Sequence, residues 1–152
     1  MTTITPFLWF DNDLEEALTL YGSLFPGTTV LSENRHPDGS LFFATFEVAG
    51  QRLYGMNGGP GHPQTDAFSL FVSVTTQDEV DKYWDALTAD GGEESMCGWL
   101  KDRFGVSWQI VPKALMDYQA DPDREKSGRV VQAMLTMRKI VIADLDAAAA
   151  AG

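Results

Sequence analysis

Phe7-Leu8-Trp9-Phe10-Asp11-Asn12-Asp13 is the stretch that decides the fold. A run of large apolar residues followed by side chains that can cap a helix predicts a buried strand leading into a helix. The next apolar residues recur at spacings of three and four, so they share one helical face: Ala17, Leu20, Tyr21 and Leu24. Pro26-Gly27 then ends the helix.

The same design returns later in the chain. Phe68 to Val74 is strand-like, and Thr75 or Thr76 is placed to cap a helix behind it. The apolar face of that helix would carry Val80, Tyr83, Trp84 and Leu87. Two copies of one supersecondary unit are therefore predicted.

Strand-like runs follow each helix. They cover 28–35, 41–49 and 51–57 in the first half, and about 94–101 and 106–112 in the second. Helices between strands exclude an all-β sandwich, so we expect an α+β fold. At 152 residues the chain fits a single domain, with module one at about 4–60, module two at about 66–112 and a helical tail at about 113–150.

Alternation along the strands predicts which side faces the helices. The aliphatic or aromatic stripe of one strand is Phe42, Ala44, Phe46 and Val48, and that of the last strand is Val106, Trp108 and Ile110. Ser107 and Gln109 point the other way, as do Phe43, Thr45 and Glu47. A mixed aromatic and polar face suits the wall of a ligand cup, and the alternative is a partly solvated sheet face.

The tail reads as helices, with an apolar stripe formed by Val130, Ala133, Met134 and Met137. Such a stripe is buried either on its own subunit or on a partner.

Charge and cysteine content narrow the function classes. The net charge of −11 and the pI near 4.4 argue against nucleic acid and anionic membranes as partners. Cys97 is the single cysteine, which excludes an internal disulfide and favours the cytoplasm. The first residues lack the basic and apolar parts of a signal peptide, and no apolar run is long enough to span a bilayer.

Several segments together resemble one superfamily. These are Ile4 to Asp11, Leu24-Phe25-Pro26, Asn57 to Pro60 and the long block from Cys97 to Pro112. They are similar to the vicinal oxygen chelate superfamily, which includes glyoxalases, bleomycin-resistance proteins and extradiol dioxygenases. Within it they resemble the PhnB-like branch, often labelled demethylubiquinone methyltransferase-like. The resemblance implies paired βαβββ modules whose sheets curl around a cup, and a homodimer.

The resemblance also implies a divalent metal bound by His, Glu or Gln. The corresponding positions here are Pro6, Tyr54, Ser69 and Gln109, of which only Gln109 is a residue type that the superfamily uses. His36 and His62 lie in turn segments and are expected to be solvated. We therefore predict no cofactor, and the alternative is a divalent metal held by other residues than those at the substituted positions. The glycine-rich segment 55–61 precedes a strand rather than a helix, which argues against the cofactor turn of a methyltransferase.

We expect the cup to be mainly apolar. Its predicted lining is Leu8, Phe10, Tyr54, Met56, Ser69, Phe71 and Gln109, with Thr45, Glu47 and Trp99 as further candidates. Trp9, Trp84 and Trp108 are expected in the core, and Cys97 is expected to be an inert core residue rather than a nucleophile.

Three functions remain open at this point. The first is a protein that binds a hydrophobic or aromatic small molecule without a metal, as bleomycin-resistance relatives do. The second is an enzyme of the superfamily, such as a lyase, an isomerase, a dioxygenase or the labelled methyltransferase, with catalytic residues that the pattern does not identify. The third is an interaction module whose cup has closed.

Overall fold

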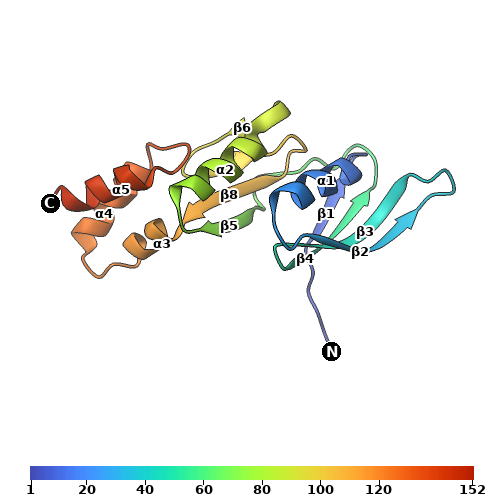
Figure 1. The fold of residues 1–152 in the computed structure, drawn as a ribbon, viewed down its shortest axis with the longest axis horizontal. Helices are drawn as coiled ribbons and strands as arrows, with labels where there is room; N and C mark the ends of the chain where they lie inside the picture. The colour runs from blue at the N-terminus through green and yellow to red at the C-terminus, as the bar shows by residue number, and fades with distance from the viewer. The chain divides into compact units, whose positions relative to one another are not determined.

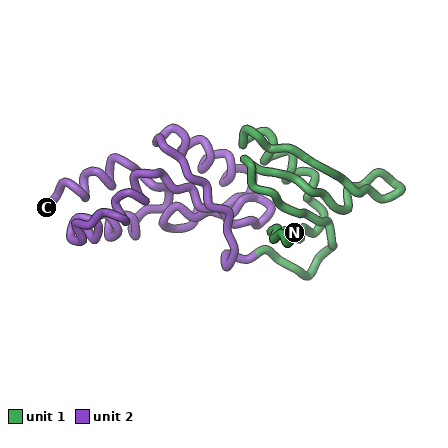
Figure 2. Tube along the Cα trace, turned by 90° about the horizontal axis from the view of Figure 1, so that it is seen from below, with its two compact units in different colours: residues 1–64 green, residues 65–152 purple.

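A computed structural model describes residues 1–152. The chain divides into two compact units, residues 1–64 and residues 65–152 (Figure 2). Each unit contains one four-stranded mixed sheet, and the sheets have the same connectivity, with orders β1-β4-β3-β2 and β5-β8-β7-β6. The predicted α+β class and the two βαβββ modules are therefore confirmed, whereas the strands form two separate, uncurled sheets rather than sheets curled around a cup.

The first unit is a helix packed on one sheet. Its elements are β1 (Phe7–Phe10), α1 (Leu14–Leu24), β2 (Thr29–Arg35), β3 (Leu41–Val48) and β4 (Gln51–Asn57) (Figure 1). β1 runs parallel to β4, and the other neighbours are antiparallel. The side chains of α1 that are buried are Leu14, Ala17, Leu18, Tyr21 and Leu24.

Two details of α1 differ from the sequence prediction. Leu20 is only half-buried and Leu18 is buried instead, because the buried face of the helix is centred on Tyr21. Asp13 does not cap the helix with its side chain. Instead, Asn57 at the end of β4 accepts a hydrogen bond from the Leu14 N–H at 2.9 Å, so a distant residue supplies the cap.

The second unit begins with β5 (Leu70–Val74) and α2 (Gln77–Thr88). Thr76 caps α2, because its hydroxyl accepts a hydrogen bond from the Glu79 N–H at 3.2 Å. A short 3-10 turn, η1 (Ala89–Gly91), leads to β6 (Glu93–Glu94), β7 (Trp99–Lys101) and β8 (Ser107–Pro112). The predicted long strand at 94–101 is thus two short strands.

Backbone geometry explains that break. Cys97 and Gly98 both have positive φ angles, 60° and 85°, which a continuous strand does not allow. Their N–H groups donate to the carbonyl oxygens of Met137 and Arg138, each at 2.8 Å. The N–H groups of this turn therefore bond to the tail, while the Gly98 carbonyl accepts from the Ile110 N–H of β8 at 2.8 Å.

The tail consists of α3 (Lys113–Gln119), α4 (Arg124–Met134) and α5 (Ile142–Ala150). It packs within its own unit around a cluster of Val111, Leu115, Val130, Met137, Ile140 and Leu145. Ala133 and Met134 pack against this cluster, so the predicted stripe is buried on its own chain. No helix has the length and apolar character needed to cross a membrane.

Candidate functional site

The sheet face of the first unit that lies opposite α1 is aromatic. The register pairs Phe7 with Tyr54, and the rings of Phe7, Phe43 and Tyr54 lie 5.6–6.4 Å apart between centroids. Phe7 is 47% exposed. Tyr54 and Met56 are half-buried on this face.

Leu8 and Phe10 were assigned to the wrong face. Leu8 pairs with Gly55, and a Cβ on Gly55 would meet the Leu14 side chain of α1 at 2.6 Å. That row therefore faces the helix, where Leu8 and Phe10 are buried in the core. The prediction began the alternation one residue out of phase, because all four residues of β1 are large and apolar.

Trp9 occupies the open face instead of the core position predicted for it. The register pairs it with Met56, and it is half-buried. Its indole Nε1 donates to the Gly59 carbonyl oxygen at 2.9 Å, and the His62 ring lies 4.4 Å from it between centroids. His62 is exposed, as predicted for a loop histidine, and its ring contacts that of Trp9 at an interplanar angle of 50°.

Thr45 and Glu47 also lie on this open face and are half-buried. Glu47 is paired across the sheet with Arg52, at 2.9 Å between Oε1 and the guanidinium nitrogen. The carboxylate therefore has a cationic partner at the sheet surface.

The open face of the second unit is built on one row across three strands. The register places Phe71 beside Gln109, and Gln109 beside Trp99. The Gln109 amide donates to the Ser69 hydroxyl at 3.0 Å. Neighbouring strands are about 4.8 Å apart, so the two aromatic residues flank Gln109 with about 10 Å between their backbones.

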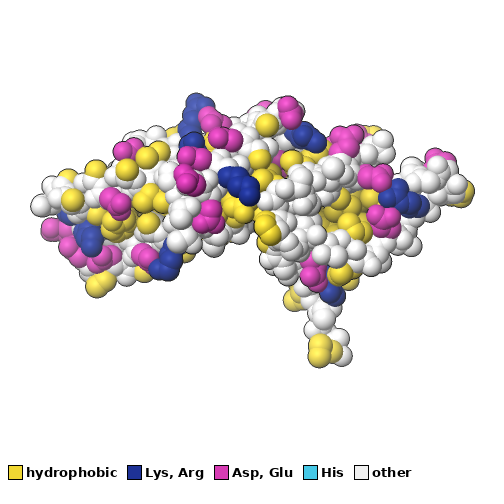
Figure 3. All heavy atoms as spheres, viewed as in Figure 1, with side chains coloured by type: hydrophobic (Ala, Val, Ile, Leu, Met, Phe, Trp, Pro, Cys, Tyr) yellow, Lys and Arg dark blue, Asp and Glu magenta, His cyan; other side chains and the backbone are white.

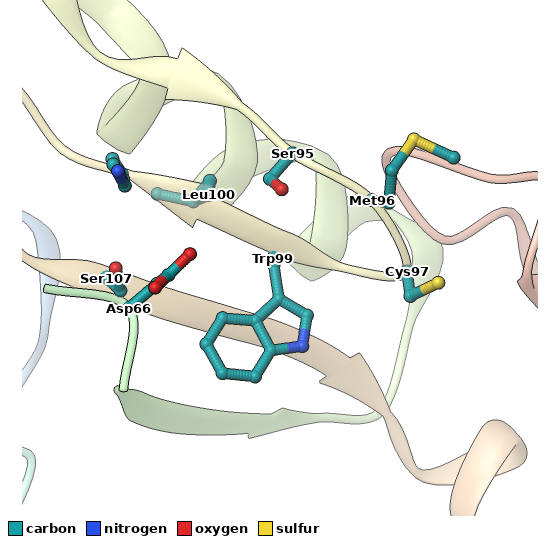
Figure 4. Close-up of a pocket in the computed structure, with 8 residues that line it drawn as sticks. Asp66, Ser95, Met96, Cys97, Trp99, Leu100 and Ser107 are labelled. Atoms are coloured by element: carbon teal, nitrogen blue, oxygen red, sulfur yellow. The ribbon is translucent and has the colours of Figure 1, made fainter. Parts of the chain in front are cut away.

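A cavity of about 490 Å³ opens beside this row. It is lined by Asp66, Ser95, Met96, Cys97, Trp99, Leu100, Lys101 and Ser107. In Figure 4, Asp66 and Ser107 lie toward one end of the cavity and Met96 and Cys97 toward the other, with the Trp99 ring between them. The volume is in the range of small-molecule sites.

Two polar groups of this cavity have no partner. The Ser107 side chain is 2% exposed, and its hydroxyl makes no hydrogen bond. Lys101 lies directly across from Ser107 on β7, and no carboxylate comes within 4.0 Å of its ammonium group. Buried hydroxyls are nearly always hydrogen-bonded, so an unpaired one at a cavity wall points to a missing partner.

Of the cavity residues, only Trp99 was among the predicted site residues. Alternation did place Ser107 on the open face beside Gln109, but no motif marked it or Lys101. Cys97 lines the cavity and is half-buried, so it is not the core residue that we expected. Its position depends on the turn at 95–98, which the strand pattern did not show.

The residues at the superfamily's metal positions do not offer a suitable donor set. Pro6 has no side-chain donor, and the Ser69 hydroxyl and Gln109 amide bond to each other. Tyr54 packs against Phe7 and Phe43. Hydroxyl, phenol and amide groups alone are poor ligands for a divalent transition metal, so no reaction step is assigned to a metal here.

Comparison with known proteins agrees with the fold. The family model for 3-demethylubiquinone-9 3-methyltransferase matches residues 2–111, and the tail lies outside that match. The PhnB protein of Bacillus cereus is 32% identical, and the match covers 73% of this chain and 99% of the relative at a TM-score of 0.66. No curated protein matches the chain.

More distant structures share the fold alone. Protein PA1353 from Pseudomonas aeruginosa is 23% identical, with coverage of 72% of this chain and 96% of that protein and a TM-score of 0.57. The fosfomycin resistance protein FosX from Listeria monocytogenes is 18% identical, with coverage of 72% and 91% and a TM-score of 0.54. The chain thus belongs to the 3-demethylubiquinone-9 3-methyltransferase family, the PhnB-like branch of the vicinal oxygen chelate superfamily.

Proposed function

We propose that this protein binds an aromatic or otherwise hydrophobic small molecule on the open sheet face of its second unit. The observation that carries the proposal is the cavity of about 490 Å³ beside Trp99. An indole ring at the wall of such a cavity offers a flat apolar surface on which another ring can stack. Phe71 supports the same use, because it is 47% exposed in the row that contains Trp99 and Gln109.

The polar groups nearby are few and fixed. Gln109 is held by Ser69, so its amide has a set orientation beside the cavity. An apolar wall with a small number of oriented polar groups is the usual composition of a small-molecule site. Contact of Tyr54 and Met56 with a ligand stays a prediction, as does any catalytic activity toward that ligand.

The family name supplies a different activity, methyl transfer, which the local structure does not favour. After β4 the glycine-rich segment leads through a loop into β5, and no helix follows it. A nucleotide-like cofactor held at a glycine-rich turn needs a helix N-terminus directly behind that turn. Binding is therefore the proposed function, in the cytoplasm and as a homodimer, the arrangement common among superfamily relatives.

A neutral aromatic probe tests the proposal. We expect 2-naphthamide to bind saturably in isothermal titration calorimetry, with one site per chain. Trp99→Ala should weaken binding about five- to tenfold, because the stacking surface is lost. Phe7→Ala is the control: it removes an exposed aromatic ring from the first unit and should leave affinity unchanged. Equal binding by the wild type and Trp99→Ala would refute the site.

A further inference from the structure

We propose that the cavity selects an aromatic anion, with Lys101 and Ser107 together binding its carboxylate. This inference rests on the proposed function, because it assumes that the aromatic body lies beside Trp99. It names the chemical class of the ligand and the residues that distinguish it from a neutral aromatic molecule.

The first step concerns the Ser107 hydroxyl. The side chain is 2% exposed, lines the cavity and has no hydrogen-bond partner. A buried hydroxyl without a partner costs about 1–3 kcal/mol relative to a satisfied one. A ligand oxygen that accepts from this hydroxyl would remove that cost, so the cavity favours a ligand with an acceptor at this wall.

The second step concerns the charge beside that hydroxyl. Lys101 and Ser107 are directly paired across β7 and β8, so their side chains leave the same sheet face about 5 Å apart at Cβ. Lys101 is half-buried, and its ammonium group has no ion-pair partner. A carboxylate is wide enough to accept from both groups, one oxygen to each.

Lys101 has no ion-pair partner, although acidic residues outnumber basic ones in this chain. The chain carries a net charge of −11, and acidic side chains are spread over the face drawn in Figure 3. Glu93 faces Lys101 across the β6–β7 ladder, yet it does not come within 4.0 Å of the ammonium group. The cation is therefore left available at the cavity rather than neutralised by its neighbours.

Asp66 is the opposing charge at the same cavity. It lines the wall but is exposed, and Figure 4 shows it near Ser107. Water screens an exposed carboxylate more than it screens the half-buried Lys101. Asp66 should thus reduce the affinity for an anion modestly without reversing the preference.

Two probes of the same shape separate this inference from the proposed function. 2-Naphthoate and 2-naphthamide share the ring system and differ in charge. We expect the wild-type protein to bind 2-naphthoate about tenfold more tightly than 2-naphthamide in isothermal titration calorimetry at low salt. Lys101→Gln should bring that ratio to about one, and Ser107→Ala should reduce the ratio.

Matched variants serve as controls. Lys82→Gln removes the same charge from the exposed surface of α2 and should leave the ratio unchanged. Asp66→Asn should raise the affinity for 2-naphthoate about two- to threefold, because it removes a like charge. Circular dichroism of each variant checks that the fold is retained.

Each outcome decides one of the two claims. If both probes bind equally to the wild type, or if Lys101→Gln keeps the full ratio, the anion site is wrong and the aromatic site stands. If Asp66→Asn weakens 2-naphthoate binding, the carboxylate is oriented toward another part of the cavity and the assignment to Lys101 fails. If neither probe binds, the proposed function is refuted, and the anion site that rests on it is refuted as well.

Discussion

The two units have the same connectivity and put different chemistry on the same face. In the first, the middle row across the sheet is Phe7, Tyr54 and Thr45, and its rings pack against one another. In the second, the equivalent row is Phe71, Gln109 and Trp99. Phe7 and Phe71 are both 47% exposed, so the row starts alike in both units.

The two units differ in the side chains that lie next to these phenylalanines. In the first unit the aromatic rings contact one another, and Glu47 forms an ion pair with Arg52. These groups therefore have partners within the sheet. The second continues with a fixed amide, a cavity, an unpaired hydroxyl and an unpaired lysine. Under the proposed function, one copy of the repeated unit has a structural role and the other binds the ligand.

The largest effect is expected from the buried carboxylate that supports the second unit. Asp102 is 2% exposed and accepts from the N–H groups of Phe104 and Val106 and from the Trp108 indole, at 2.9–3.0 Å. Asp102→Ala leaves these donors unpaired and should lower the free energy of unfolding by about 3–5 kcal/mol in urea denaturation.

The exposed Asp117→Ala is the control for that variant, since its carboxylate contacts only Lys113 at the surface. Hydrogen exchange should show the loss of protection mainly in residues 65–152. Equal loss in both units would mean that they unfold together and that the contrast between them does not extend to stability.

An intermediate effect is expected in the first unit at Gly55. A methyl group there would meet Leu14 at 2.6 Å and Phe46 at 3.1 Å. Gly55→Ala should therefore overpack the contact between α1 and the sheet and cost about 1–3 kcal/mol. Protection against hydrogen exchange should fall in α1 and β4, while 2-naphthamide affinity should stay at the wild-type value. A loss of affinity would show that the first unit takes part in binding.

A smaller effect is expected where the tail joins α2, a connection that the first unit lacks. The Gln77 side chain donates to the Ile140 carbonyl at 3.0 Å and accepts from the Ile142 N–H at 2.8 Å. Gln77→Ala should cost about 1–2 kcal/mol and speed hydrogen exchange in α5. The neighbouring Asp78→Ala serves as the control. Unchanged exchange in α5 would mean that the apolar cluster alone holds the tail.

The smallest effect is a pH dependence at the same junction. The pKa of Asp81 lies below its ordinary value of 3.8, chiefly because the Gln77 amide donates to it and also because of the Lys139 ammonium group. A carboxyl whose pKa is lower in the folded state adds stability above its unfolded pKa and loses it as the pH falls through the folded value. The protection factors of the α5 amides, which take the intrinsic pH dependence of exchange into account, should therefore fall below about pH 3.8 in the wild type, and less so in Asp81→Asn.

The sequence predicted the modules because their signals are local. The helical faces of α1 and α2, the Thr76 cap and the alternation of β8 all follow from residues a few positions apart. β1 was predicted wrongly for the opposite reason: its four large apolar residues show no alternation, so Leu8 and Phe10 were assigned to the cup and Trp9 to the core.

The cavity could not be predicted because its parts depend on distant contacts. The turn at Cys97 and Gly98 is held by the carbonyl groups of Met137 and Arg138, forty residues further along the chain. The pairing of Lys101 with Ser107 follows from strand register, and the absence of a partner for Ser107 follows from everything packed around it. Composition and spacing carry none of this information.

The indole N–H signals of the tryptophans test the contrast between the units most directly. Trp9, Trp84 and Trp108 donate to Gly59, Glu94 and Asp102, respectively. Trp99 lines the cavity in the second unit. In two-dimensional ¹H–¹⁵N spectra, assigned with single Trp→Phe variants, adding 2-naphthamide should shift the Trp99 indole signal and leave that of Trp9 in place. A shift of Trp9 with Trp99 unmoved would contradict the account, since the ligand would then lie on the aromatic face of the first unit.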